Sequence, residues 1–541
     1  MSTPPQGPQS NQPGGQSPPP PGYGPPSQGG AQPPPPPGYG PPQGQPAAPQ
    51  NAGPAQEWGY PSTPPKKSRT KTWVALGVAG AFALALCGGG GLFAYSKLGG
   101  GGPQPETALP AETIGYVKVD LDPSADQKVD MVRFANKFPA FKDEIGTLDE
   151  DDDLRKQIFE SIQEEGGLED VDYEKDVEPW LGKRFAVAAL PSDDGSGPQP
   201  VIVLASEDKE AAEEGLSKMT DGDGYCSVQD DFALCGEEQS VVDDAVTGAE
   251  EGSLADDEEF SQDMDDLGED GIASAWFDMS KAKELDPAMS SASTEGRIAM
   301  ALRFDGPTVE LAGRMNGLPE ESVPSGDGTS VEALPEDTAA ALGIAGLDDS
   351  ITSAWPEVEK NLDDVMGPSW QQDIETQTGL QVPEDIAKAL GSDTVLSVGA
   401  DPTTPKVALR TNGDRSTIDD MVELIQGPDT SSYPSSYSSG GPQVFVKDGD
   451  EDRVVVSNDE GYAEEVASGS GLGDSEAFKD AVPDADKASV VGFVDIASLV
   501  ENYGGEMDAD ERANAEVLSA VGFSASGEDD HADFSVRLTT K

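Results

Sequence analysis

The chain has 541 residues, with 102 acidic side chains against 34 basic ones and a formal net charge of −68. Nucleic-acid binding needs a basic surface, and anionic lipid repels negative charge. The composition therefore excludes nucleic-acid partners and adsorption to an anionic membrane surface. The first 72 residues hold four basic side chains and one acidic one, so the remainder carries −68 − 3 = −71.

Residues 1–72 are predicted to form a cytoplasmic tail that is rich in Pro, Gly and Gln and has a basic end. Residues 1–65 hold 23 of the 46 prolines, and the motif PPPPGYGPP occurs twice. Proline removes backbone donors, and the segment has almost no aliphatic side chains to bury, so we expect disorder with local polyproline II. The tail is either a ligand for a proline-recognising partner or a solvated spacer, and the spacer is the simpler interpretation.

The uncharged run at 73–95, WVALGVAGAFALALCGGGGLFAY, predicts a transmembrane helix. At about 1.5 Å per residue it is long enough to cross a bilayer core of roughly 30 Å. Four basic residues lie within 66–71 and only Lys97 follows closely, so we expect a cytoplasmic N-terminus and an extracytoplasmic C-terminal region of a cell-membrane protein. The alternatives are a cleaved signal, which the long preceding tail disfavours, and a lipoprotein with Cys87 as the lipidated residue, which the preceding Leu-Ala-Leu disfavours.

Small residues recur at every fourth position of this run, at Gly77, Ala81, Ala85 and Gly89. Such a stripe lets two helix backbones approach closely, so it offers a homodimer through the span. The simpler interpretation is that small residues are frequent in membrane helices.

Beyond a linker at 96–108, a series of sequence elements occurs once and then again in the same order. LPAETIGYVKVDLDP at 109–123 returns as LPEDTAAALGIAGLDD at 334–349, and comparable pairs follow to the C-terminus. We therefore predict two homologous modules, 109–317 and 334–541, joined by a Gly/Ser/Pro and acidic linker at 318–333.

Apolar alternation predicts strands at 115–119, 184–189, 201–205, 224–235, 273–278, 298–304 and 309–315 of the first module. The spacing of Ala212, Leu216 and Met219 predicts a helix at 209–219. Strands joined by hairpins with inserted helices indicate an α+β fold, in which each module is a mostly antiparallel sheet.

The segment YCSVQDDFALCG at 225–236 predicts a hairpin with a two-residue loop at Asp230 and Asp231. This register places Cys226 opposite Cys235 on a non-hydrogen-bonded rung, where side chains approach most closely. A cross-strand disulfide is feasible there, and it suits the oxidising compartment that the predicted span implies. With two cysteines and one histidine available, zinc binding is not expected.

No established catalytic or metal motif is recognised. The segment from Asp448 resembles the start of a calcium loop but has Arg453 where glycine is needed and Asp459 where glutamate is needed, so a solvated acidic turn is expected. His531, the only histidine, lies in an acidic turn and is expected to be solvated rather than catalytic. Trp180 is either a platform for a sugar or, more simply, a core anchor.

The segments LPAETIGYVKVDLDPSADQK (109–128), RFANKFP and DYEKDVEPWLG (172–182) resemble the actinobacterial domain of unknown function 3352 family. The resemblance spans most of 105–541 and implies a membrane-anchored extracytoplasmic envelope protein, but it carries over no activity. The second module departs from the family pattern, since Trp180 aligns with Ala389 and Tyr116 with Ala341.

These features lead us to expect a single-pass membrane protein whose duplicated acidic region binds an unidentified extracytoplasmic protein or glycan. A structural envelope spacer is the alternative, and a carboxylate-based hydrolase is the third hypothesis. No catalytic set, cofactor or metal is expected.

Overall fold

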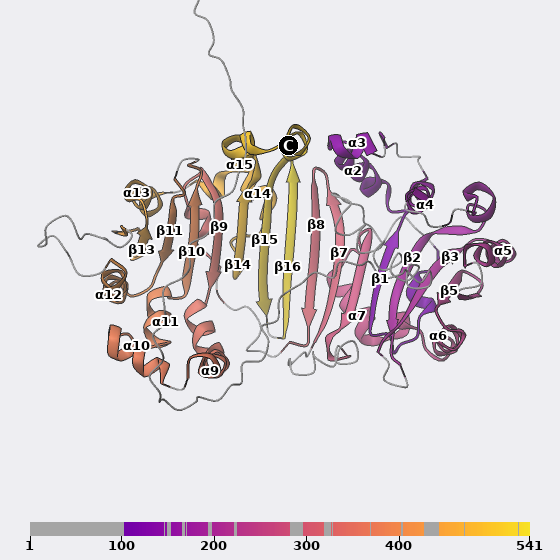
Figure 1. The fold of residues 1–541 in the computed structure, drawn as a ribbon, viewed down its shortest axis with the longest axis horizontal. Coiled ribbons are helices and arrows are strands. Elements are labelled where there is room, and N and C mark those ends of the chain that lie inside the picture. The colour runs from indigo at the N-terminus through magenta and orange to yellow at the C-terminus, as the bar shows by residue number, and fades with distance from the viewer. Residues whose placement is uncertain are drawn as a thin grey trace, which may run out of the picture. The chain divides into compact units, whose positions relative to one another are not determined.

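A single antiparallel β-sheet runs through the described part of the chain (Figure 1). The computed structural model describes residues 102–541 except 145, 149–152, 165–167, 169, 193–196, 221–223, 282–295, 319–325, 327, 368, 402–403, 427–442, 470 and 529. The predicted tail and the predicted span at 73–95 lie outside the described residues. Among the helices that are described, none is long and apolar enough to cross a bilayer.

The first half contains eight strands, and every strand predicted for the first module is confirmed. They are β1 (Gly115–Asp120), β2 (Leu181–Leu190), β3 (Gln199–Ser206), β4 (Tyr225–Val228), β5 (Phe232–Gly236), β6 (Ala273–Asp278), β7 (Arg297–Asp305) and β8 (Thr308–Asn316). The helical elements are η1 (Pro105–Ala108), α2 (Ala125–Ala135), α3 (Pro139–Glu144), α4 (Leu154–Glu164), η2 (Tyr173–Val177), α5 (Lys209–Thr220), α6 (Gln239–Glu251), η3 (Leu254–Asp256), α7 (Glu258–Leu267) and η4 (Met279–Lys281). The helix predicted at 209–219 is α5.

The second half also contains eight strands. They are β9 (Thr338–Ala345), β10 (Asp393–Gly399), β11 (Val407–Thr411), β12 (Phe445–Asp448), β13 (Val454–Ser457), β14 (Val490–Asp495), β15 (Leu518–Glu528) and β16 (His531–Thr540). The helical elements are η7 (Val331–Ala333), α9 (Leu347–Met366), α10 (Trp370–Thr378), α11 (Glu384–Leu390), α12 (Arg415–Gln426), α13 (Glu460–Ser468), η9 (Leu472–Asp474), α14 (Glu476–Ala481), α15 (Ile496–Tyr503), η10 (Gly504–Glu506) and α16 (Ala509–Ala515).

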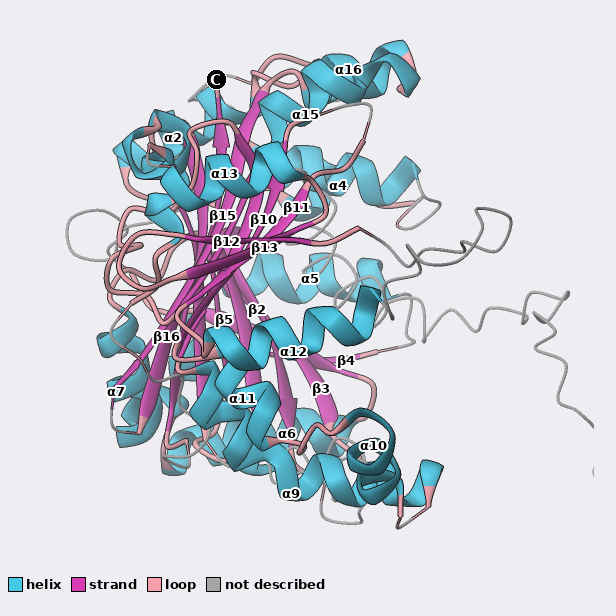
Figure 2. Cartoon of the chain, turned by 90° about the vertical axis from the view of Figure 1, so that its left-hand side faces the viewer, coloured by secondary structure: helices cyan, strands magenta, loops and turns pink. Residues whose placement is uncertain are grey.

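The two halves arrange their strands in the same order. From its outer edge the first half runs β4-β5-β3-β2-β1-β6-β7-β8, and the second runs β12-β13-β11-β10-β9-β14-β15-β16. Each strand number of the first half thus corresponds to the number eight higher in the second. Helices lie on both sides of the twisted sheet (Figure 2). The prediction of an α+β fold with an antiparallel sheet is confirmed.

The halves meet where β8 pairs with β16, so the strands of both predicted modules form one sheet rather than two. Thr308 faces Thr539 at one end of this seam and Asn316 faces His531 at the other, with Ala312 opposite Ser535 at its centre. Pairing leaves neither strand as an exposed edge with unsatisfied backbone groups. Sequence periodicity predicts each strand but not which edges join, because that choice depends on partners far away in the chain.

The principal core covers the face of the sheet that contains Tyr116. In the first half, α6, α7 and η3 pack on this face, with the rings of Phe260 and Trp276 5.5 Å apart. In the second half, α13, α14 and η9 do the same, with Phe478 and Phe493 5.2 Å apart. Tyr116 lies opposite Trp276, and Ala341 lies opposite Phe493, as expected from the alignment of Tyr116 with Ala341.

The opposite face, which contains Val119, is covered by other helices. A cluster from α2 places Phe134 against Phe304 of β7, with ring centroids 5.4 Å apart, and Leu538 of β16 packs at its margin. Next to it on the first half lie α4, η2 and α5, and a pocket opens between α4 and the start of η2.

Candidate functional site

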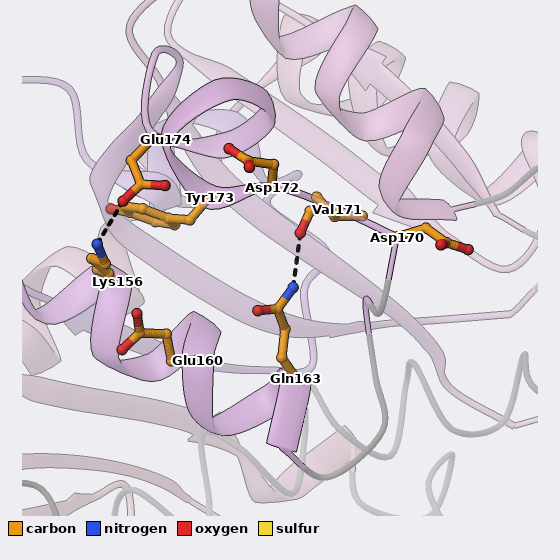
Figure 3. A pocket seen from close by; sticks show the side chains of 8 residues that line it. All are labelled: Lys156, Glu160, Gln163, Asp170, Val171, Asp172, Tyr173 and Glu174. Atoms are coloured by element: carbon orange, nitrogen blue, oxygen red, sulfur yellow. Dashed lines mark hydrogen bonds and ion pairs between the residues drawn. The ribbon is translucent and has the colours of Figure 1, made fainter.

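A polar pocket lies between helix α4 and the segment 170–174 (Figure 3). Its volume is about 390 Å³, and it is lined by Lys156, Glu160, Gln163, Asp170, Val171, Asp172, Tyr173 and Glu174. We call it the carboxylate pocket. The three residues from α4 are spaced by four and three positions, which places them on one face of that helix.

The segment that forms the other wall is held in shape by hydrogen bonds from within and from α4. Gln163 donates from Nε2 to the carbonyl oxygens of Leu168 and Val171, at 3.0 and 2.8 Å. Asp172 begins the π-helical turn η2, and its carboxylate accepts from the backbone N–H of Lys175 at 3.0 Å. Single π-helical turns are rare and occur frequently at functional sites.

The pocket has a strongly negative formal charge. Glu160, Asp170, Asp172 and Glu174 contribute four negative charges and Lys156 one positive charge, which leaves −4 + 1 = −3. Lys156 Nζ lies 2.6 Å from Glu174 Oε1. This hydrogen bond raises the pKa of Lys156 and lowers that of Glu174, so both groups are charged at neutral pH.

Tyr173 forms the floor of the pocket, and its hydroxyl is already engaged. The ring is buried against Phe159, with centroids 5.5 Å apart, and the hydroxyl donates to Asp153 Oδ2 at 2.8 Å. Burial and then this hydrogen bond raise the pKa of Tyr173. Burial alone would raise the pKa of Asp153, but the hydrogen bonds from Arg155 and Tyr173 outweigh it and lower that pKa. Tyr173 is therefore a structural floor rather than an exposed aromatic platform.

A buried network anchors η2 to helix α5. Asp176 accepts from Lys218 Nζ at 2.8 Å, and this hydrogen bond is the main reason that the pKa of Asp176 is lowered. The indole of Trp180 donates to the carbonyl oxygen of Asp176 at 2.8 Å, and Trp180 is 1% exposed. Gly215 of α5 lies so close that a Cβ atom would stand 2.3 Å from both the Asp176 oxygen and the Trp180 indole nitrogen.

This burial decides between the two interpretations of Trp180. The side chain is a core anchor, and the sugar-platform alternative is wrong because the indole has no accessible face. The corresponding loop of the second half keeps one feature: Asp385, four residues before Ala389, accepts from the N–H of Gln381 as Asp176 accepts from that of Asp172.

The predicted hairpin and its cysteines are present as expected. Cys226 of β4 pairs with Cys235 of β5 in register, with Cα atoms 4.2 Å apart, and the two form a disulfide. The register leaves Asp230 and Asp231 as the two-residue loop, as predicted. The disulfide lies beside Trp180 at the margin of the cluster that supports α5.

The remaining sequence candidates lie apart from the carboxylate pocket. His531 begins β16, with its ring nitrogen 3.8 Å from the carboxylate of Asp530. The calcium-like segment is the turn between β12 and β13, where Glu451 and Asp452 adopt positive φ angles of 58° and 59°. Within the described residues, no group of three or more His, Cys, Asp or Glu side chains is placed to hold a metal ion.

Sequence reasoning did not identify the carboxylate pocket. The sequence indicates the segment 172–182 only through a family resemblance, and it carries no motif at the α4 residues. The polar spacing at 156, 160 and 163 was the available signal, but amphipathic helices commonly carry such a face.

Comparison with known proteins gives one match. Residues 75–227 match the family model described as "Protein of unknown function (DUF3352)", and this range includes the whole carboxylate pocket and Cys226. No curated protein and no solved structure matches the chain.

Proposed function

With the chain a member of the DUF3352 family, we propose that it is a membrane-anchored, extracytoplasmic binding protein whose ligand enters the carboxylate pocket. The pocket carries the proposal, because it is a built concavity with a formal charge of −3 inside the family-matched segment. Anionic side chains and one amide favour a ligand that is cationic and rich in hydrogen-bond donors. An amino sugar has both properties.

Three observations support the anchoring and the layout. The family match begins at residue 75, inside the uncharged run at 73–95. The Cys226–Cys235 disulfide favours an oxidising compartment for the region after that run. The identical strand order of the two halves, with β8 against β16, supports an origin by duplication.

Binding is favoured over catalysis because the amine and the phenolic hydroxyl of the pocket are already engaged. The Lys156 ammonium is paired with Glu174, and the Tyr173 hydroxyl is donated to Asp153. A nucleophile or general base needs a free position facing the substrate.

A calorimetric titration of the full chain in detergent with glucosamine tests the proposed site. We expect saturable binding of glucosamine that is stronger than that of its neutral relatives, glucose and N-acetylglucosamine. Glu160→Gln should weaken it about threefold to fivefold, the effect of losing one partly solvated charge partner. The matched control is Asp420→Asn, at an exposed carboxylate of the second half, which should not alter the affinity. Equal affinity for the neutral sugars, or no effect of Glu160→Gln, contradicts the assignment.

Topology is tested separately with a membrane-impermeant maleimide on intact cells. Asp420→Cys should be labelled before lysis, and Ser68→Cys, in the predicted cytoplasmic tail, only after lysis. The reverse pattern would overturn the orientation.

A structural spacer is the second candidate function, and the continuous sheet favours it. Sixteen strands give fifteen spacings of about 4.8 Å, so the sheet extends roughly 70 Å along its hydrogen-bonding direction. The glucosamine titration discriminates the two, since a spacer requires no ligand.

A further inference from the structure

Unsatisfied buried polar atoms of the second half belong to the 329–330 segment and to two arginines near Asp393. Of the six buried side-chain nitrogen and oxygen atoms without a hydrogen-bond partner in the described residues, four belong to Thr329, Ser330, Arg410 and Arg453. Native proteins rarely leave such atoms unpaired, and an absent ion is one of the recognised reasons.

These residues come together from separate segments of the chain. Arg410 on β11 faces Val455 of β13, and Arg453 precedes that strand by one residue. Both guanidinium groups lie near Asp393 at the start of β10, which pairs with Arg453 and accepts from the backbone N–H of Ser330 at 3.2 Å. Arg410 donates from one terminal nitrogen to the carbonyl oxygen of Ala333 at 3.2 Å, which leaves its Nε unpaired.

The cluster has one positive charge more than it can neutralise internally. Arg410 is 5% exposed, and the Arg453 side chain is 15% exposed. Two guanidinium groups against the Asp393 carboxylate leave a formal charge of +2 − 1 = +1. Glu451 approaches Arg453 only to 4.0 Å and is 82% exposed, so solvent screens it. Burial and then the charge of Arg453 lower the pKa of Arg410, and the charges of Asp393, Glu451 and Asp450 only partly oppose this shift.

The first half shows how this fold neutralises a buried cation. In the matching row of strands, Lys118 of β1 is buried but lies 2.7 Å from Asp270 and 3.4 Å from Glu106. The position of β9 that corresponds to Lys118 is Gly343. Gly343 pairs with Val395 of β10, and Val395 pairs with Arg410 of β11, so the buried cation lies two strands further along the same cross-strand row. Lys118 therefore has two carboxylates within 3.4 Å, whereas the two cations Arg410 and Arg453 have one shielded carboxylate, Asp393, between them.

We propose that Arg410, Arg453 and the hydroxyls of Thr329 and Ser330 bind a small oxyanion. Guanidinium donors match the planar spacing of carboxylate and phosphate oxygens, and hydroxyl donors complete such sites. The anion supplies the missing negative charge and the missing acceptors together. The site lies in the second half and does not rest on the function proposed for the carboxylate pocket.

The test is calorimetric titration of the full chain in detergent with inorganic phosphate at constant ionic strength. Sulfate and acetate titrations distinguish a tetrahedral oxyanion from a carboxylate, and chloride serves as the ionic control. We expect saturable 1:1 binding of at least one oxyanion and a thermal midpoint that rises with its concentration. A response no larger than that to chloride overturns the proposal.

Arg410→Met should weaken the binding at least about tenfold, since it removes a charged donor from a buried site. Asp393 keeps its ion pair with Arg453 in this variant, so no buried carboxylate loses its cation and the variant is expected to fold. The matched control is Arg512→Met on α16, whose guanidinium is exposed and paired with Glu516, and it should bind as the wild type does. Undiminished binding by Arg410→Met refutes the location.

Glu451→Gln tests the same site through an expected increase in oxyanion affinity rather than a decrease. Its carboxylate competes with the anion for Arg453, so its removal should tighten oxyanion binding about twofold to threefold. This variant leaves the buried residues intact, so it also decides the matter if Arg410→Met fails to fold. Weaker binding by Glu451→Gln argues against the site.

Discussion

Gly215→Ala is the sharpest test of how the carboxylate pocket is held to the rest of the molecule. Helix propensity alone predicts stabilisation, because alanine is favoured over glycine by about 1 kcal/mol in a helix interior. The structure predicts the opposite sign. The new Cβ would lie 2.3 Å from the Asp176 carbonyl oxygen and from the Trp180 indole nitrogen, neither of which is a flexible side-chain end.

The magnitude follows from three contributions. Overpacking a close contact costs about 1–3 kcal/mol. Displacing the indole breaks its hydrogen bond to the buried Asp176 oxygen, at a net cost of about 1 kcal/mol. Subtracting the gain in helix propensity leaves a destabilisation of about 2 kcal/mol. Because α5 packs directly against η2, the loss of stability should be confined to α5 and the 172–180 segment.

Hydrogen exchange followed by mass spectrometry measures this local free energy. Amides of η2 and α5 should exchange about thirtyfold faster in Gly215→Ala, which corresponds to the 2 kcal/mol. The matched control is Ser217→Ala in the same helix, at an exposed position, which gains helix propensity without a clash and should exchange no faster than the wild type. Unchanged or slower exchange in Gly215→Ala would refute the reasoning, since helix propensity would then outweigh the contact.

Three further predictions concern the disulfide, a buried lysine and a helix cap. Reduction of Cys226–Cys235 opens a loop with a sequence separation of 9 and should cost up to about 2.7 kcal/mol by loop entropy, seen as faster exchange in β4 and β5. Lys118→Met leaves the half-buried carboxylate of Glu106 without its cation and should cost about 3 kcal/mol, measured by exchange in β1. Hydrogen bonds from Ser416 and Thr417 lower the pKa of Asp414 to about 2 from its ordinary 3.8. The ionised Asp414 carboxylate therefore stabilises α12 fully above pH 3.8, and this stabilisation is lost as the pH falls towards 2. The thermal midpoints of the wild type and Asp414→Asn should converge over that interval.

Each of these has a matched control. The double variant Cys226→Ser/Cys235→Ser should not respond to reductant, and a response there would assign the effect elsewhere. Adding Glu106→Gln to Lys118→Met should recover part of the lost stability, and no recovery would contradict the charge argument. If the thermal midpoints of the wild type and Asp414→Asn differ by the same amount at pH 2 and at pH 5, the lowered pKa of Asp414 is contradicted.

Much of the fold was accessible from local sequence patterns. The first-module strands, helix α5 and the Cys226–Cys235 register were predicted correctly, because alternation and loop length are properties of short segments. The carboxylate pocket was not predicted, since α4 and the 170–174 segment are brought together by tertiary contacts such as those of Gln163 with Val171 and Lys156 with Glu174.

The sequence by itself determined the acidic charge, the strands of the first half and the hairpin register, because each depends on composition or on neighbours within a few residues. Only the tertiary structure decided that β8 pairs with β16 and joins both halves in one sheet. It alone brought Arg410 and Arg453 together with a single carboxylate, because that balance depends on segments as distant in the sequence as residues 330 and 453. Charge neutralisation inside a core is a property of the packed neighbourhood, and no local pattern encodes it.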